Sequence, residues 1–166
     1  MIPLVLQFVP WRQVSSWRCN GCGDCCRDYG VVLKFPEWLK IVNTFGQEKT
    51  VAGLERLYIR RREDGSCSFL CHFAGNYLCG LQGMKPDACK IWPFKVLVEP
   101  RYGEPTQACF ELAGRRLFVY VDGNCPGLRF GAPSWEFAHG TVREFVELAA
   151  GARMVQHKTT GKLARY

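Results

Sequence analysis

The sequence predicts a small, irregular α+β domain that is rich in cysteine and binds metal. Three observations lead to this prediction. Short strand-like runs alternate with helical stretches, residues 63–93 are rich in Gly, Cys and Pro, and 10 of the 166 residues are Cys. A long stretch without regular periodicity is unusual inside a compact domain, and metal coordination can order such a stretch. We therefore expect a short β-hairpin or sheet, about three helices, and loops that carry metal ligands.

The regular elements are predicted from local periodicity and from turn residues. Runs of β-branched and aromatic residues predict strands at 31–35, 94–98 and 116–121. Helical spacing or a helix-opening residue predicts helices at 36–42, 47–62 and 134–157. Pro36 occupies a first-turn position of the first of these helices. Ser134 or Thr141 is expected to cap the last one, and Thr141 with Glu144 fits a capping box.

We expect residues 1–166 to form a single domain, because this length is ordinary for one domain. Apolar residues make up 48% of the chain, which is enough for a hydrophobic core. Within the domain we distinguish an N-terminal arm (1–18), a cysteine-cluster core (19–131), and a C-terminal helix with a basic tail (132–166). No internal repeat and no linker divides the sequence further.

The sequence favours a cytoplasmic protein without a membrane partner. No apolar run approaches the length of about 18 residues that a membrane-spanning helix requires. The apolar start lacks a basic segment and a cleavage site of the kind found in signal peptides. Thiols stay reduced in the cytosol, where clustered cysteines are more often ligands than disulfides, although proteins of hyperthermophiles are an exception.

The charge and the termini suggest two classes of partner. The formal net charge is +7, and basic residues continue after Glu147, which is the last acidic residue. This tail suits RNA or the ribosome, and Trp11, Trp17 and Tyr166 lie beside arginines where they would stack on bases. A solvated surface and aromatic core packing are the alternatives. The apolar arm 1–11 is a candidate docking strand for a protein partner.

The first cysteine group has the spacing C-x2-C-x2-C, formed by Cys19, Cys22 and Cys25. A tight loop returns every third side chain to the same side, so three thiolates at this spacing can converge on one centre. The same spacing opens the bacterial ferredoxin motif, whose fourth cysteine precedes a proline. Cys125 precedes Pro126 and is therefore a candidate fourth ligand.

Cys26 directly follows Cys25, and the side chains of adjacent residues are expected to diverge. A second centre would therefore use Cys26. The other ligands of this second centre would be Cys67, Cys71, Cys79 and Cys89, and Cys109 would be a spare. A single metal centre with additional structural cysteines is an alternative interpretation, and disulfide bonds are a third.

Iron–sulfur is favoured over zinc as the bound metal. Zinc sites usually show two C-x2-C knuckles or cysteine pairs with histidine pairs. This sequence has no second C-x2-C, and its histidines (His72, His139 and His157) are scattered. We expect one or two iron–sulfur clusters, of the 4Fe-4S type, with zinc as the alternative cofactor.

The whole pattern resembles the CxxCxxCC family of zinc- or iron-chelating proteins, also called YkgJ-like cysteine-cluster proteins. The matching segments are 19–27, 67–70, 79–81, 85–94 and 125–128. The resemblance implies eight metal ligands: Cys19, Cys22, Cys25, Cys26, Cys67, Cys79, Cys89 and Cys125. Cys71 and Cys109 look like additions to the pattern. Lys85 and Lys90 stand where the family usually has arginine, which keeps the charge and loses bidentate hydrogen bonding.

No catalytic motif was found, so we expect a non-enzymatic metal-binding protein. The sequence lacks a Walker loop, a G-x-S-x-G elbow and an H-E-x-x-H motif. Three roles remain open: a structural or electron-transfer cluster, a zinc-stabilised RNA- or ribosome-associated module, and an accessory subunit that supplies a cluster to a redox or modification enzyme.

Overall fold

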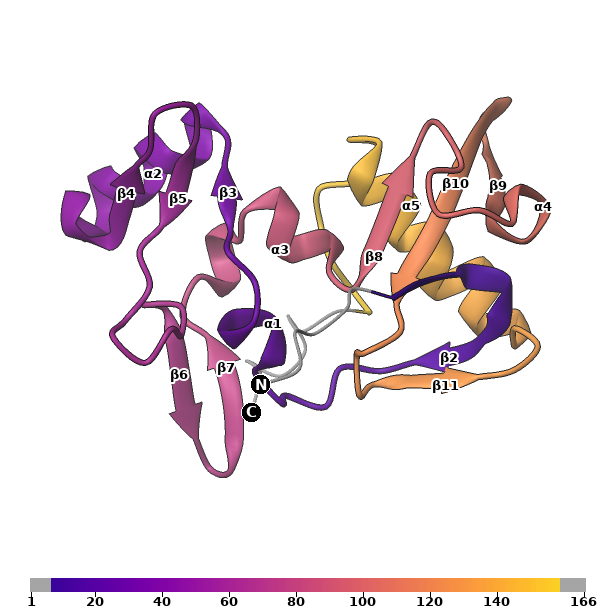
Figure 1. The fold of residues 1–166 in the computed structure, drawn as a ribbon, viewed down its shortest axis with the longest axis horizontal. Coiled ribbons are helices and arrows are strands. Elements are labelled where there is room, and N and C mark those ends of the chain that lie inside the picture. Colours follow the sequence, from indigo (N-terminus) through magenta and orange to yellow (C-terminus); the bar gives the residue numbers. More distant parts are fainter. Residues whose placement is uncertain (1–6, 159–166) are drawn as a thin grey trace. The chain divides into compact units, whose positions relative to one another are not determined.

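The computed structural model describes residues 7–158, which form two compact units (Figure 1). Among the described residues, unit 1 comprises residues 7–20 and 91–158, and unit 2 comprises residues 21–90. Within the described residues, short helices are mixed with several small antiparallel sheets, which confirms the predicted α+β class. The division into an arm, a cysteine-cluster core and a C-terminal part stays a prediction, and the two units do not follow its boundaries.

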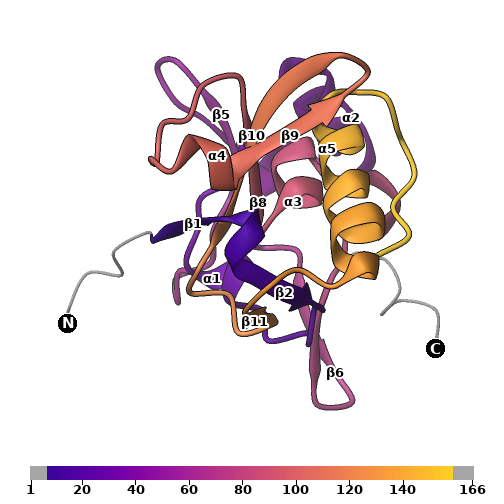
Figure 2. The ribbon, with the colours of Figure 1, turned by 90° about the vertical axis from the view of Figure 1, so that its right-hand side faces the viewer.

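Unit 1 is built around the long strand β10 (Arg115–Asp122), which pairs antiparallel with three other strands. Strand β8 (Phe94–Leu97) pairs with Phe118–Val121. Strands β9 (Cys109–Leu112) and β1 (Phe8–Pro10) pair with the two ends of β10, and Figure 2 shows the long β9–β10 hairpin. The strands predicted at 94–98 and 116–121 are thus confirmed.

The other elements of unit 1 are short and surround this sheet. Strand β2 (Val14–Trp17) pairs with β11 (Leu128–Phe130). The 3-10 turn η1 (Trp11–Gln13) links β1 to β2, and α4 (Pro105–Ala108) precedes β9. The π-helical segment η4 (Phe137–Val142) continues into α5 (Arg143–Ala149).

The core of unit 1 lies between the sheet and the last helix. Phe145 of α5 is fully buried, and its ring stacks on Phe94 at 4.0 Å between centroids. Trp17 meets both rings edge to face. Such aromatic pairs add about 0.5–1.5 kcal/mol each beyond the area they bury. Unit 1 is therefore stabilised mainly by apolar packing.

The predicted C-terminal helix is confirmed at its start and is shorter than expected. Ser134 caps it, because its Oγ accepts the Phe137 amide at 3.1 Å. The helix ends at Ala149 and not at residue 157. The predicted capping box at Thr141 is wrong, because Thr141 lies inside continuous helix. The Glu144 carboxylate instead accepts the amides of His157 and Lys158 from the segment that follows the helix.

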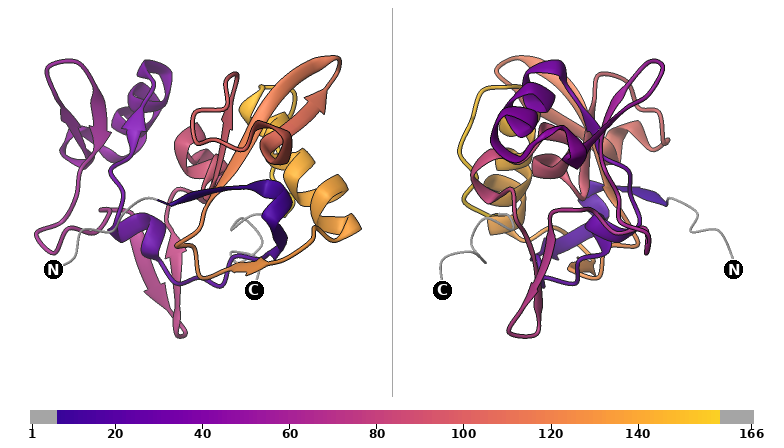
Figure 3. Two further views of the ribbon diagram at one scale, coloured as in Figure 1. Left: turned by 45° about the vertical axis from the view of Figure 1, so that its right-hand side comes forward. Right: turned by 90° about the vertical axis from the view of Figure 1, so that its left-hand side faces the viewer.

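Unit 2 consists of short elements. In chain order they are α1 (Asp24–Arg27), β3 (Val32–Leu33), α2 (Phe35–Phe45), η2 (Gln47–Lys49), β4 (Thr50–Ala52), β5 (Leu57–Ile59), β6 (Leu70–Phe73), β7 (Asn76–Cys79), η3 (Gln82–Met84) and α3 (Asp87–Ile91). The sheet order is β3-β5-β4, and β6 pairs with β7 in a separate hairpin. Helix α2, which confirms the helix expected at 36–42, packs on β4 and β5 (Figure 3).

The helix predicted at 47–62 is wrong, because this segment forms the β4–β5 hairpin. The Gly53 amide donates to the Arg56 carbonyl at 2.8 Å and closes the turn. Thr50, Val51 and Tyr58 are residue types that favour strands, and a glycine inside a helix is unfavourable. The helical spacing was misleading, because Leu54 is fully exposed at the turn.

Residues 63–93 are less irregular than expected. They contain the β6–β7 hairpin, in which Leu70 pairs with Cys79 and Phe73 with Asn76. They also contain η3 and α3. The hairpin and the two short helices hold the cysteines of this segment in fixed backbone positions.

Candidate metal centre

Five cysteines of unit 2 come from four segments that the fold brings together. Cys25 and Cys26 lie on α1, Cys67 precedes β6, Cys79 ends β7, and Cys89 lies on α3. Cys67 is buried and the other four are half-buried. Cys67 belongs to the core of unit 2, and Cys26 and Cys79 pack against that core. None of the five is joined by a disulfide bond.

Gly23 is the N-cap of helix α1, and its left-handed backbone (φ +76°) directs the chain into the helix. A Cβ at this position would lie 2.9 Å from the Tyr77 ring of β7. The Tyr77 amide also donates to the Gly21 carbonyl at 3.0 Å. Only glycine suits this combination of backbone and close contact. The loop that carries Cys22 is thereby fixed against β7.

The Cys25 and Cys26 thiols approach each other, contrary to the predicted divergence of adjacent side chains. Their Sγ atoms are 4.0 Å apart. In a tetrahedral zinc site with Zn–S bonds of about 2.3 Å, two sulfur ligands stand about 3.8 Å apart. The side-chain torsions on the short helix α1 therefore overcome the divergence of the two Cα–Cβ bonds. The pair is spaced to ligate one metal atom.

Cys67 is positioned by main-chain hydrogen bonds and by two arginines. Its amide donates to the Cys26 carbonyl at 2.7 Å, which joins the loop to α1. The Arg62 guanidinium donates to the carbonyls of Ser68 and Leu70 at 3.0 and 2.9 Å. The Arg61 guanidinium bonds the Arg27 carbonyl at the end of α1. These two charges organise the ligand loop from within unit 2.

Cys79 and Cys89 lie at the two ends of one segment. The Leu81 amide donates to the Cys79 sulfur at 3.4 Å, a hydrogen bond that favours a thiolate. The Cys89 amide donates to the Pro86 carbonyl at 2.9 Å. Glu37 of α2 accepts the Asp87 amide at 2.8 Å and so holds the first residue of α3. Helix α2 thereby fixes the element that carries Cys89.

The thiols influence one another's protonation. A hydrogen bond from Cys26 lowers the pKa of Cys25 to about 7, and the same bond raises the pKa of Cys26. Burial raises the pKa of Cys67, Cys79 and Cys89. The negative charges of neighbouring thiolates act in the same direction, as expected for a cluster of like charges. Without metal, the group is therefore expected to hold most of its protons at neutral pH.

The donor set fits a thiophilic metal, although the side chains are not yet at ligand positions. Within residues 7–158, no three Cys, His, Asp or Glu side chains stand where they could bind one ion together. All five donors are sulfur, which suits zinc and iron and does not suit calcium or magnesium. Metal binding would draw these thiols together, so it would be coupled to folding of unit 2.

The remaining predicted ligands are distributed over both units. Cys22 lies in the loop before α1 in unit 2, and Cys19 and Cys125 belong to unit 1. In unit 1 the Trp17 indole donates to the Cys125 sulfur at 3.4 Å, and both Cys19 and Cys125 pack against the core. The eight-ligand set stays a prediction.

Two cysteines were set aside by the sequence. Cys71 of β6 is exposed, and Cys109 begins β9 in unit 1. Neither residue forms a disulfide bond.

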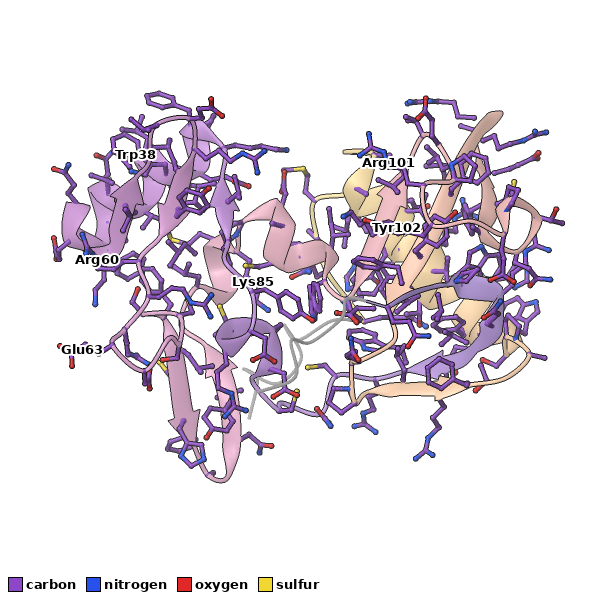
Figure 4. The ribbon with its side chains drawn as sticks, in the orientation of Figure 1. Trp38, Arg60, Glu63, Lys85, Arg101 and Tyr102 are labelled. Atoms are coloured by element: carbon purple, nitrogen blue, oxygen red, sulfur yellow. The ribbon has the colours of Figure 1, made fainter. Side chains whose placement is uncertain are left out.

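Sequence reasoning missed the residues that position the thiols. Arg62 and Glu37 were not predicted to belong to the site, whereas Lys85 lies in a segment that the family resemblance covers. Lys85 lies between Cys79 and Cys89 along the chain, and Figure 4 labels it in the part of unit 2 where α1, β7 and α3 lie. Its position beside a proline within the cysteine pattern was the available signal. No sequence signal identifies Glu37.

The groups on which the RNA hypothesis rests have other roles in the described residues. Trp11 and Trp17 are buried in the core of unit 1, so core packing accounts for both. Arg153 pairs with Glu147 at 2.7 Å, and Lys158 pairs with Glu136 at 3.2 Å. Tyr166, Lys162 and Arg165 lie outside the described residues. An RNA or ribosome partner stays a prediction.

The apolar arm is partly used inside unit 1. Phe8–Pro10 forms β1 and pairs with β10, and Trp11 is buried. Residues 1–6 lie outside the described residues. A partner-docking role therefore stays a prediction that concerns mainly those six positions.

Together, the fold and the grouped cysteines define a small α+β cysteine-cluster protein. The chain belongs to the CxxCxxCC family, described as a putative zinc- or iron-chelating domain, whose pattern matches residues 18–112. This range includes every cysteine of unit 2, and it supports a zinc- or iron-chelating function. No curated protein and no solved structure matches the chain. Among the described residues, no helix combines the length and apolar character needed to cross a membrane.

Proposed function

We propose that unit 2 binds zinc or iron through four thiolates drawn from its five grouped cysteines, with Cys25 and Cys26 on the same metal atom. The observation that carries this proposal is the gathering of all-sulfur donors from four segments, with two Sγ atoms 4.0 Å apart. The family's zinc- or iron-chelating description supports it.

The spacing of the Cys25–Cys26 pair favours a centre in which one metal atom carries two cysteines. A single zinc or iron ion meets this condition, as does a [2Fe–2S] cluster, which four cysteines also ligate. In a [4Fe–4S] cluster each iron takes one cysteine, so the two thiolates would have to separate. The C-x2-C-x2-C spacing supports a [4Fe–4S] cluster as the second candidate.

The role of the centre is proposed to be structural or electron-transferring. Coordination would tie α1, the Cys67 loop, β7 and α3 together, and these elements share only a small apolar core. A redox-active iron centre in the same position would pass electrons to a partner. Both roles need the same ligands, and the identity of the metal separates them, because zinc has no redox chemistry.

The test is metal analysis with absorption spectroscopy on protein purified without oxygen. An iron centre gives visible absorption that dithionite bleaches, and a zinc centre gives a colourless protein with stoichiometric zinc. Replacing Cys25 or Cys26 with Ser is expected to reduce metal content, and Cys71→Ser and Cys109→Ser are the matched controls. Replacing Cys67, Cys79 and Cys89 one at a time identifies the two that complete the ligand set. Wild-type protein that binds neither metal stoichiometrically would overturn the proposal.

A further inference from the structure

The β3-β5-β4 sheet of unit 2 has one covered face and one uncovered face. Helix α2 packs on β4 and β5, and Leu33 and Ile59 are buried with it in the core of unit 2. Directly opposite residues of an antiparallel pair project from the same face, and successive residues along a strand project from opposite faces. Tyr58 of β5 is opposite both Val32 of β3 and Val51 of β4. These three side chains therefore form a row on the other face, which we call the outer face.

The outer face is apolar and open to solvent. Val32 is 38% exposed and Val51 is 39% exposed. Tyr58 is half-buried, and its ring extends over Gly53 of the β4–β5 turn, where a Cβ would stand 3.3 Å from Tyr58 Cε2. The ring thus lies along the sheet and does not stand out from it. Its hydroxyl has no hydrogen-bond partner among the residues that the structure describes.

Two arginines flank this row. Arg56 and Arg60 each lie two residues from Tyr58, and the ladder hydrogen bonds of the hairpin reach both, so they project from the outer face as well. The Arg60 guanidinium donates to the carbonyls of Glu48 and Thr50, which are neutral groups, at 2.7 and 3.3 Å. Neither arginine forms an ion pair with a described residue. Five of the seven charged residues in segment 47–62 are basic. The positive charge of the outer face is therefore available to an anionic partner.

An aromatic ring between two unpaired arginines matches the chemistry of single-stranded RNA. A base of any sequence can stack on such a ring, and its phosphates would meet the arginines. The free hydroxyl of Tyr58 offers a partner to the ribose 2′-hydroxyl, which DNA lacks. We infer that the outer face of the β3-β5-β4 sheet binds single-stranded RNA, with Tyr58 as the stacking residue. This function goes beyond metal binding and uses none of the cysteines.

Variants of the ring test stacking. Full-length protein, purified without oxygen, is titrated into a fluorescein-labelled oligouridine at low salt, and binding is followed by fluorescence anisotropy. We expect Tyr58→Ala to weaken binding by about tenfold or more, because a base loses its stacking surface. Tyr58→Phe keeps the ring and should stay within about threefold of wild type. Phe130→Ala, which removes an exposed ring from unit 1, should bind as wild type does.

Variants of the charge test the sign of the partner without removing the ring, and they serve also if Tyr58→Ala does not fold. Val51→Glu and Val51→Lys are a matched pair at one exposed position, with similarly low strand propensity. Val51→Glu should weaken RNA binding, and Val51→Lys should preserve or strengthen it. Arg56→Met should reduce the slope of log affinity against log salt by about 0.7, as loss of one phosphate contact requires. Arg129→Met, at an exposed position of β11, should leave the slope unchanged.

Four results would overturn the inference. They are absence of RNA binding by the wild-type protein at low salt, equal affinities of wild type and Tyr58→Ala, equal affinities of the two Val51 variants, and tighter binding of an oligothymidine DNA or of an acidic apolar peptide than of RNA. Metal content is measured on the same samples. A wild-type protein without metal would contradict the proposed function, so the two failures are distinguishable.

Discussion

Units 1 and 2 are stabilised in different ways. Unit 1 has an eight-residue central strand, three strands paired to it, and a core with several fully buried aromatic and aliphatic side chains. Unit 2 has strands of two to four residues and a core of seven buried residues, one of which is Cys67. Apolar burial contributes about 25 cal/mol per Å2, so the smaller core of unit 2 contributes correspondingly less.

This difference indicates where a metal is needed. In unit 2 the loops are held by guanidinium–carbonyl hydrogen bonds and by amide bonds between ligand segments, such as Cys67 to Cys26. Such hydrogen bonds contribute only about 0.5–3 kcal/mol each. Unit 1 is therefore expected to fold by packing alone, and unit 2 is expected to depend on coordination.

Metal removal should give the largest effect, and this effect should differ between the two units. Structural zinc contributes about 10–16 kcal/mol in zinc-finger peptides, so a chelator should unfold unit 2. Hydrogen exchange is expected to accelerate across residues 21–90, while β10 and α5 keep their protection. Equal loss of protection in both units would refute a metal requirement confined to unit 2.

Phe145→Ala should produce the largest effect of a single substitution, and in unit 1. Phe145 is fully buried against Phe94 and Trp17, so truncation should cost about 3–5 kcal/mol. The loss, measured by denaturant unfolding, should be the same with and without metal. Phe130→Ala is the control, because Phe130 is 61% exposed in the same unit. If the stability that Phe145→Ala loses differed with and without metal, this would contradict the separate stabilisation of the two units.

Arg62→Met should destabilise unit 2 by about 2 kcal/mol, because it leaves the Ser68 and Leu70 carbonyls without their charged donor. Arg62→Lys should recover only part of this loss, since lysine lacks the forked donor geometry. Thermal unfolding of the metal-bound protein measures the stability of both Arg62 variants. Arg116→Met, at an exposed position of β10, serves as the control. If Arg62→Met and the control Arg116→Met lose equal stability, Arg62 does not organise the Cys67 loop.

The metal-free protein should lose stability as pH rises above about 9. Burial raises the pKa of Cys67, Cys79 and Cys89 above the ordinary value of 9.0, so their unfolded thiols lose protons first. The stability from these neutral thiols is complete below pH 9.0 and is lost as pH rises toward the folded values. Cys25, with its pKa lowered to about 7, has the opposite dependence and loses its contribution as pH falls from 9 toward 7.

With metal bound, the ligands are already thiolates, so the alkaline loss should disappear and acid should instead release the metal. Thermal unfolding between about pH 8 and about pH 10.5, a range that includes the ordinary pKa of a thiol, compares the two forms with and without metal. Identical pH profiles would show that the thiols do not bind the metal.

Cys71→Ser should have the smallest effect. Cys71 is exposed on β6, and surface substitutions usually change stability by less than about 0.5 kcal/mol. Metal content should also be unchanged, as measured by elemental analysis. Loss of metal in this variant would add Cys71 to the ligand set.

The sequence predicts the parts of the fold that depend on local signals. The strands at 94–97 and 115–122 and the helix opened by Pro36 were found, because apolar periodicity and a proline in the first turn act locally. The β4–β5 hairpin was missed, because Val51, Leu54 and Leu57 mimic helical spacing. In the structure Val51 pairs with Tyr58 and Leu57 pairs with Ala52, across a turn that is closed by the Gly53 amide. The pairing of strands β4 and β5, and not the local apolar spacing, determines the structure of this segment.

The site was predictable only as a set of candidate ligands. The family resemblance implied a ligand set that includes Cys25, Cys26, Cys67, Cys79 and Cys89, and the structure places these five in one unit. The approach of the Cys25 and Cys26 sulfurs depends on side-chain torsions, which spacing does not encode. Glu37 accepts the amide of Asp87, which lies 50 residues away in sequence, and Arg62 donates to the Ser68 carbonyl, so only the fold reveals these two contacts.

X-ray absorption at the metal edge of the purified protein tests most directly whether the unit 2 thiolates hold the metal. A thiolate centre predicts a first shell of sulfur at about 2.3 Å, diminished in Cys25→Ser and unchanged in Cys71→Ser. A first shell of oxygen and nitrogen in the wild-type protein would contradict it.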